Sequence, residues 1–559
     1  MQTNRTSRLG APGLTVAAAL AAAAPLAAAG PLGLASTLAA QEPEVVTLGV
    51  PSPLVEVRMM IKAGSAHDPT GKEGLAALTA QALLQASYGN PDSPVNKEEL
   101  AKITRPWGGG ADPGALVDKE TTTFIFTVPK EVLDEYIEKV MHPLFTQPLF
   151  DESEIERLKN EAATNLSGSL RYENIEMAGL EAIDNYIFAG TPHGHTVAGS
   201  VQGVESITRE DVRSFYATYY RPSNVILGIS SSDASVVSSL KGALDGMGVI
   251  SGGVRRLQLV DLAPPAPVKG RELTIVAMPD AGATAIHLAF PIEIDRTDPD
   301  FWPLYVANVY FGTHRDSHSY LYKEIREKRG YNYGDYSYIE HFAYRPFNLF
   351  RPFNTPRSYQ YFLIWIRPVD TKYGHHILKA ADWELENLLR KGVPDDEVEL
   401  SKNKAKVLYL NLAENSSRLL GARVDDAWWD MEPGYLEGYL DRIEAVTPEQ
   451  VNAALRNYLQ ADNVKYLVVT EADKAEELAA NIRAGENIWG KTPEDYRIDV
   501  EESDGTKIYD VPQDKLDILR KDAVWAYHPL RLDADRIRVV PVEALFETRA
   551  FVTETDATQ

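Results

Sequence analysis

Two histidines have the spacing of a metal-binding pair. His314 and His318 lie four residues apart, so on a helix both imidazoles would face the same side and could hold a metal ion. Asp316 and Ser317 stand between them, and both residue types are typical of loops and of helix caps. Because the next helix is predicted only for residues 320–328, the pattern favours a polar loop, with the metal-binding pair as the alternative.

The sequence lacks the other common catalytic signatures. It contains no cysteine, which excludes disulfides, cysteine nucleophiles, thiolate zinc sites and iron–sulfur clusters. It also has no G-x-S-x-G elbow, no phosphate-binding loop ending in G-K-[ST], and no H-E-x-x-H or H-x-x-E-H zinc helix. The formal net charge is -24, whereas sequence-independent binding to nucleic acid needs a basic surface. We therefore expect no nucleic-acid partner.

The first forty residues have the layout of an export signal. Arg5 and Arg8 precede an apolar, alanine-rich stretch at 14–29 and a run of small residues that ends at Ala40. Prolines and glycines interrupt this region, which counts against the alternative of a retained membrane anchor. We expect residues 1–40 to be a cleaved signal peptide, with no membrane span after it. An exported protein without disulfides fits a bacterial periplasm.

The chain after this signal contains an internal repeat. The pattern I-T-R-E-D-V, followed by Y and then N-V, at 207–225 matches V-T-P-E-Q-V, Y and N-V at 446–464, with an offset of 239 residues. A second match, between 154–160 and 397–403, has an offset of 243 residues. Two matches in the same order and at nearly the same offset indicate a duplicated domain.

A proline-rich stretch separates the two copies. Residues 252–270 are predicted to be a linker between an N-terminal domain at 41–251 and a C-terminal domain at 271–482, with 483–559 as an extension outside the repeat. Both domains contain strands and helices in the same order, which is typical of an α+β sandwich. The predicted strands are 54–63, 121–128, 224–229, 272–277, 285–290 and 361–366, and the predicted helices are 72–86, 131–141, 153–166, 301–311 and one that begins at Thr208.

Four segments carry a resemblance to a known family. They are Gly64-Ser65 followed by G-L-A-A-L-T-A-Q-A-L-L at 74–84, F-D-E at 150–152, Y-R-P-S-N at 220–224, and L-Y-K-E-I-R-E-K-R-G-Y-N-Y at 321–333. In this order they resemble the insulinase/pitrilysin zinc metallopeptidases, and with the repeat the resemblance covers about residues 45–480. It implies two homologous α+β sandwich domains of the LuxS/metallopeptidase-like fold in tandem.

The residues that bind zinc in that family are replaced here. The family places H-x-x-E-H on its first helix, and the resemblance puts Ala77 and Gln81 at the two histidines and Ala80 at the glutamate. The third ligand, a glutamate, falls on Asn165, or on Glu161 if the alignment is shifted by one helical turn. A single carboxylate cannot hold zinc, because three protein ligands are the usual catalytic minimum. The resemblance therefore implies no cofactor in this chain and no peptidase activity by the chain alone.

The R-x6-Y segment of the family is intact, as Arg326 and Tyr333. In two-chain members, such as the mitochondrial processing peptidase, the resemblance implies that the chain without zinc supplies this pair to its partner's active site. A guanidinium and a phenol can both stabilise the oxyanion that develops on a peptide carbonyl. The alternative is a structural salt bridge or helix-end contact among Arg326, Glu327, Lys328 and Arg329.

These features together predict a non-catalytic subunit of an exported, insulinase-like heterodimer. This chain would bind peptide and supply Arg326 and Tyr333, and a partner chain of the same family would carry H-x-x-E-H and the zinc ion. The alternative is a peptidase-derived scaffold or peptide-binding protein that has no catalytic partner.

Overall fold

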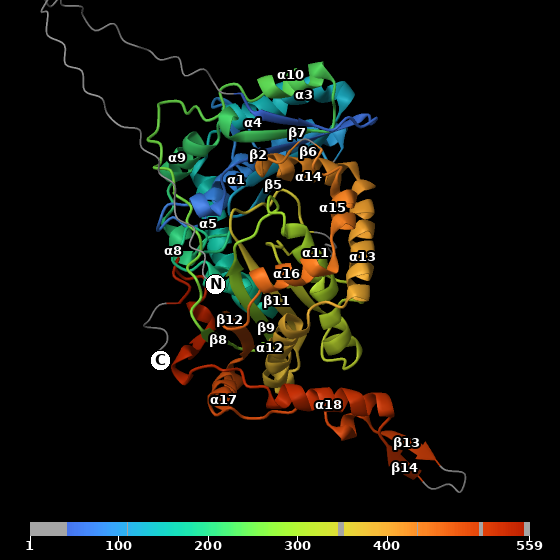
Figure 1. Ribbon diagram of the computed structural model, residues 1–559. Coiled ribbons are helices and arrows are strands. Elements are labelled where there is room, and N and C mark those ends of the chain that lie inside the picture. Colours follow the sequence, from blue (N-terminus) through green and yellow to red (C-terminus); the bar gives the residue numbers. More distant parts are fainter. Residues whose placement is uncertain (1–41, 109, 345–350, 433, 502–506, 553–559) are drawn as a thin grey trace, which may run out of the picture. The chain divides into compact units, whose positions relative to one another are not determined.

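The computed structural model describes residues 42–108, 110–344, 351–432, 434–501 and 507–552 (Figure 1). They belong to one compact unit, Glu42–Gln559. The predicted signal peptide, 1–40, lies outside the described residues. Within the described part, no helix has the length and apolar character needed to cross a membrane.

The N-terminal domain is built on a five-stranded sheet. Its strands, in spatial order, are β1 (Glu44–Thr47), β7 (Val225–Ile229), β2 (Leu54–Ile61), β6 (Thr122–Pro129) and β5 (Gly114–Val117). β1 and β7 are parallel, and the other neighbouring strands are antiparallel. Alternate residues of a strand face the same side, so β6, the clearest strand of the sequence, places Phe124, Phe126 and Val128 in the core.

The C-terminal domain repeats this sheet. Its corresponding strands are β8 (Arg271–Met278), β12 (Val464–Glu471), β9 (Thr284–Ile292), β11 (Gln360–Val369) and β10 (Asp335–Tyr338). As in the first sheet, the first two are parallel and the following neighbours are antiparallel. The same strand order and directions in both domains confirm the duplication that the sequence predicts.

The repeated helices also begin in the same way. α9 (Arg209–Tyr219) leads to β7, and α16 (Pro448–Tyr458) leads to β12. Thr208 and Thr447 are the capping residues, and each side chain accepts a hydrogen bond from the backbone NH of the third helical residue. The capping pattern seen in the sequence therefore marks the start of equivalent helices in the two domains.

Other elements complete the two domains. In the described part, the remaining helices of eight or more residues are α1 (Leu75–Gln85), α2 (Lys97–Thr104), α5 (Glu152–Thr164), α7 (Ile175–Ile187), α10 (Ala234–Gly242), α11 (Phe301–Gly312), α12 (Gly374–Lys391), α13 (Asp395–Ala413), α14 (Ser416–Trp428), α17 (Ala472–Arg483) and α18 (Gln513–Tyr527). The helix predicted at 131–141 is a succession of short 3-10, α and π turns over 130–141. Two small hairpins pair β3 (Tyr88–Asn90) with β4 (Ser93–Val95), and β13 (Ile498–Glu501) with β14 (Lys507–Asp510).

Each domain supplies a helix to the sheet of the other domain. α7, from the N-terminal domain, packs on β9, β11 and β12, whereas α14, from the C-terminal domain, packs on β1, β2 and β7. Glycines permit the close approach: a Cβ on Gly179 of α7 would lie 2.2 Å from Cε1 of His287 in β9. Likewise, a Cβ on Gly228 of β7 would lie 2.5 Å from Cγ2 of Val424 in α14. The two domains therefore share buried core surface.

The C-terminal extension is part of the C-terminal domain. β15 (Ile537–Pro541) pairs in parallel with β8 and becomes the sixth strand of that sheet. Trp525 of α18 is fully buried in the core of the domain, and α18 packs on α12. The sequence places 483–559 outside the repeat, and β15 indeed extends the sheet beyond the five repeated strands. Residues 253–269, within the predicted linker, form neither helix nor strand.

Candidate functional site

The positions that the resemblance aligns with zinc-binding residues lie on α1 and at the end of α5. Ala77 and Gln81 are partly buried on one side of α1, and Ala80 is buried in the core of the N-terminal domain. Asn165 is exposed and begins a π-helical turn, η5 (Asn165–Ser169), that continues α5. Glu161, in the last turn of α5, is also exposed.

Helices α1 and α5 pack against each other in opposite directions. At the end of α1, Ser87 donates its backbone NH to Oδ2 of Asp151, the residue before α5, over 2.7 Å. One turn into α5, Arg157 donates to Oε1 of Gln85 over 2.6 Å. The start of α5 thus lies at the end of α1, and the later turn at 161–165 runs back toward the segment 77–81.

These side chains do not fit a zinc ion. They offer no imidazole and no thiolate, and Glu161 is the single carboxylate among them. Arg157 forms an ion pair with Glu161 over 2.9 Å, and Gln81 accepts a hydrogen bond from Gln85 over 2.8 Å. Three good ligands are the usual minimum for catalytic zinc, so these positions lack the ligands that a zinc-dependent step needs.

The R-x6-Y segment lies between α11 and β10. Arg326 is in a π-helical segment, η7 (Tyr322–Glu327), where its guanidinium lies 5.0 Å from the centre of the Tyr322 ring. Its Nε atom is buried and has no hydrogen-bond partner among the described residues. Tyr333 is 78 % exposed. Burial raises the pKa of the neighbouring Asp335 well above its usual range, and the positive charges of Arg367 and Arg326 oppose that rise.

The basic neighbours of Arg326 form the ion pairs that the alternative interpretation expects. Lys328 pairs with Glu324 over 2.5 Å. Arg329 is buried and pairs with Asp522 of α18 over 2.5 Å. Arg326 itself makes no ion pair with a carboxylate in the part of the chain that the structure describes. Lys328 and Arg329 therefore form the structural ion pairs of this segment, whereas Arg326 has no carboxylate partner among the described residues.

The two histidines with metal-like spacing lie in the loop between α11 and η7, not on a helix. His314 is buried, and its Nδ1 lies 2.7 Å from the hydroxyl of Tyr338. His318 is largely exposed and lies 3.4 Å from Asp316. The structure thus supports the polar loop rather than the metal-binding pair.

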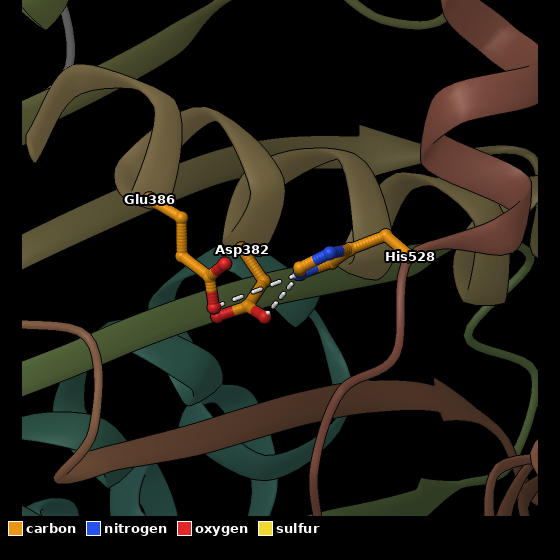
Figure 2. A group of neighbouring side chains, drawn as sticks. All are labelled: Asp382, Glu386 and His528. Carbon is orange, nitrogen blue, oxygen red and sulfur yellow. Dashed lines mark hydrogen bonds and ion pairs between the residues drawn. The ribbon is translucent and has the colours of Figure 1, made fainter. Parts of the chain in front are cut away.

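A different group has the composition of a metal site. Asp382 and Glu386, one turn apart on α12, converge with His528 from the segment after α18 (Figure 2). His528 Nε2 lies 2.8 Å from Asp382. However, Arg271 contacts Asp382 over 2.7 Å and Glu386 over 2.8 Å, and Arg531 also pairs with Glu386.

This group is best explained as an ion-pair network. Two guanidinium groups already neutralise both carboxylates, and a dication there would be repelled by Arg271. Tyr466 additionally donates its hydroxyl to Asp382 over 2.6 Å. The network joins the C-terminal extension to α12 and β8. The sequence shows only the spacing of Asp382 and Glu386, because His528 is distant along the chain.

A second buried network lies between the two domains. Arg357 of the C-terminal domain pairs with Asp118 over 2.9 Å and with Asp184 of α7 over 2.7 Å. Lys119, also fully buried, lies 3.1 Å from Asp184. Burial alone would raise the pKa values of both aspartates, but the charge of Arg357 holds them well below their usual range. Three consecutive charged residues, Asp118 to Glu120, resemble an exposed turn in the sequence, which is why this network escapes prediction.

Comparisons with known proteins agree with the fold and identify the family. Residues 45–197 match the sequence model of the insulinase family (peptidase family M16), and residues 206–405 match that of the peptidase M16 inactive domain. The chain belongs to the insulinase, or M16, peptidase family. An uncharacterized zinc protease of Streptomyces coelicolor is 26% identical over 281 residues, which are 49% of this chain and 56% of that protein. The chain thus spans little more than half the length of this curated relative.

Solved M16 structures share the fold. A peptidase M16 inactive domain from Pseudomonas fluorescens superimposes with a TM-score of 0.64 and 22% identity, covering 76% of this chain and 95% of that one. A protease from Helicobacter pylori superimposes with a TM-score of 0.62 and 16% identity, covering 76% and 96%. At identities below 25%, these similarities show the fold alone, which is two M16 domains in tandem. They confirm the predicted fold class.

Proposed function

We propose that this protein is a non-catalytic M16 subunit that binds peptide and supplies Arg326 and Tyr333 to the active site of a zinc-carrying partner of the same family. The observation that carries the proposal is the state of this pair. Arg326 has no carboxylate partner in the described structure although its basic neighbours are paired, and Tyr333 is exposed. The substituted positions on α1 and α5 support a role that needs another chain for the metal.

The chemistry of the pair suits amide hydrolysis by a partner. An unpaired guanidinium and an exposed phenol are donors that can approach the oxygen of a scissile carbonyl as its negative charge develops. In this arrangement the zinc ion and the H-x-x-E-H helix reside in the partner. We further propose that the protein is exported through residues 1–40 and acts in the periplasm.

The test begins with the assembled complex. The tagged protein is purified from its host, chains that co-purify are identified by mass spectrometry, and zinc is measured in the complex and in the isolated chain. We expect a second M16 chain with H-x-x-E-H, zinc in the complex, and none at stoichiometric level in the isolated chain. The same spectra give the mature N-terminus, which should begin near residue 41.

Reconstitution then tests the two residues. Arg326→Ala and Tyr333→Phe should each assemble normally, while peptide cleavage falls roughly a hundredfold to a thousandfold, the usual loss for one oxyanion donor. Arg326→Lys should also be impaired, because an ammonium does not reproduce the forked guanidinium. Lys323→Ala, in the same segment, is the control and should keep full activity. Full activity in the Arg326 and Tyr333 variants, with normal assembly, would instead favour a scaffold.

A further inference from the structure

The loop that carries Tyr333 has no regular secondary structure of its own. Residues 328–334 connect η7 to β10 and form neither helix nor strand. The side chain of Tyr333 is largely exposed, so the place of its hydroxyl depends on the backbone of this loop. A catalytic donor needs a defined place, because a shift of about 1 Å can cost roughly a hundredfold in rate. Contacts from other parts of the chain must therefore position the loop.

Helix α18 of the C-terminal extension holds the start of the loop. Arg329 contacts Asp522 of α18 over 2.5 Å, and neither side chain is exposed to water. The guanidinium of Arg329 also lies 4.0 Å from the centre of the Trp525 ring. Lys521, in the same helix, pairs with Glu324 of η7 over 2.9 Å. The extension is thus joined to the chain on both sides of the step from η7 into the loop.

A second part of the extension holds Tyr331, two residues before Tyr333. The backbone NH of Lys491 donates a hydrogen bond to the hydroxyl of Tyr331 over 2.9 Å, and Nζ of Lys491 donates to the backbone carbonyl of Arg329. Gly490 lies so close that a Cβ there would be 2.1 Å from the hydroxyl oxygen of Tyr331. The ring of Tyr331 is buried in the core of the C-terminal domain, so the extension holds its outer end while the core holds its face.

The next residue, Asn332, is tied to the sheet. Its amide donates to the backbone carbonyl of Arg367 in β11 over 3.0 Å and to the carboxyl group of Asp335 over 2.7 Å. Tyr333 therefore follows two residues that are held in place. The contact at Tyr331 comes from residues that lie outside the repeated domains.

We propose that the C-terminal extension positions Tyr333, and that Gly490 and Lys491 are positioning residues that act through Tyr331. The assignment rests on the proposed role of Tyr333 as a donor to the partner's active site, and it names the part of the chain that sets its place. Arg326 depends less on these contacts, because it lies within η7 and the helical backbone holds it.

The experiment measures peptide cleavage by the complex of this chain with its zinc-carrying partner and determines kcat and KM separately. Gly490→Ala should lower kcat about tenfold to a hundredfold and leave KM nearly unchanged, because a displaced donor weakens binding of the transition state alone. Tyr331→Phe removes the hydroxyl but keeps the packed ring, so it also serves if Gly490→Ala disturbs the fold. Here kcat should fall about twofold to tenfold, the rate equivalent of one neutral hydrogen bond.

The Tyr333→Phe background separates positioning from a loss of folded protein. Once the Tyr333 hydroxyl is gone, neither Gly490→Ala nor Tyr331→Phe should lower kcat further by more than about twofold, since both act through that hydroxyl. Gly242→Ala, where nothing lies within 4 Å of the added Cβ, is the matched control and should keep full activity.

The possible results distinguish this assignment from the function on which it rests. A loss of kcat by the same factor in both backgrounds would show a structural role and overturn the positioning role alone. Wild-type kcat in Gly490→Ala and Tyr331→Phe, although Tyr333→Phe is impaired, would do the same. Full activity of Tyr333→Phe would overturn the proposed role of Tyr333, and this assignment with it.

Discussion

The buried network at Arg357 makes the clearest prediction about stability. The side chains of Arg357, Asp118 and Asp184 are 3, 4 and 7 % exposed, so all three charges lie away from water. Replacing Arg357 by methionine keeps most of the side-chain volume but removes the positive charge that pairs with both buried aspartates. Asp184 retains Lys119, and Asp118 retains His341 at 3.2 Å.

The expected cost follows from the loss of one partner in a buried ion pair. Such losses amount to about 3–5 kcal/mol, because the remaining charge stays desolvated. Unfolding entropy scales with chain length at about 2.1 cal/mol/K per residue, so for a chain of this size the melting temperature should fall by about 3–5 °C. Differential scanning calorimetry at pH 7 measures it. Arg157→Met is the matched control, since the ion pairs of Arg157 are exposed and worth about 0–1 kcal/mol.

The difference in melting temperature between Arg357→Met and the wild type should depend on pH. In the folded wild type the pKa values of Asp118 and Asp184 lie well below their unfolded values near 3.8, so their stabilising contribution is present above that pH and lost below it. Without Arg357, burial raises the pKa values of Asp118 and Asp184. Protonation therefore removes their buried negative charge at a higher pH in the variant than in the wild type. The difference in melting temperature should therefore shrink as pH falls from 7 to 4. An Arg357→Met protein that melts within 1 °C of the wild type at pH 7, like the control, would refute this reasoning.

Two further predictions concern the packing of the domains. Gly179→Ala places a methyl group against His287, so we expect it to lower the free energy of unfolding by about 1–3 kcal/mol in a urea titration, whereas Gly168→Ala, where nothing lies within 4 Å, should change it little. Truncation after residue 482 removes β15 and the buried Trp525. The product should aggregate on size-exclusion chromatography or melt at a much lower temperature in calorimetry. Truncation after residue 552 should leave the melting temperature unchanged. Wild-type stability of the Gly179→Ala variant would contradict the close contact with His287. Wild-type stability of the 482 truncation would contradict the structural role of β15 and Trp525.

The sequence by itself determines the local elements and the duplication. Alternating apolar residues predict β6, helical spacing predicts α1, and the capping residues Thr208 and Thr447 mark equivalent helices, because these signals depend only on neighbours along the chain. The family resemblance aligns Ala77 and Gln81 with the zinc-binding histidines, and the identities of these two residues are read from the sequence alone.

Only the tertiary structure decides which charges are buried and which elements belong together. Asp118 and Arg357 are far apart in the chain, and their pairing depends on α7 and α14 each packing on the sheet of the other domain. Pattern reasoning cannot find such pairs, because a charged residue next to a strand looks the same whether water or a distant guanidinium faces it. The same holds for β15, whose place beside β8 comes from a parallel pairing across the C-terminal domain. Parallel pairing and buried ion pairs join residues that are distant in sequence, so their stabilising contacts exist only once the chain has folded.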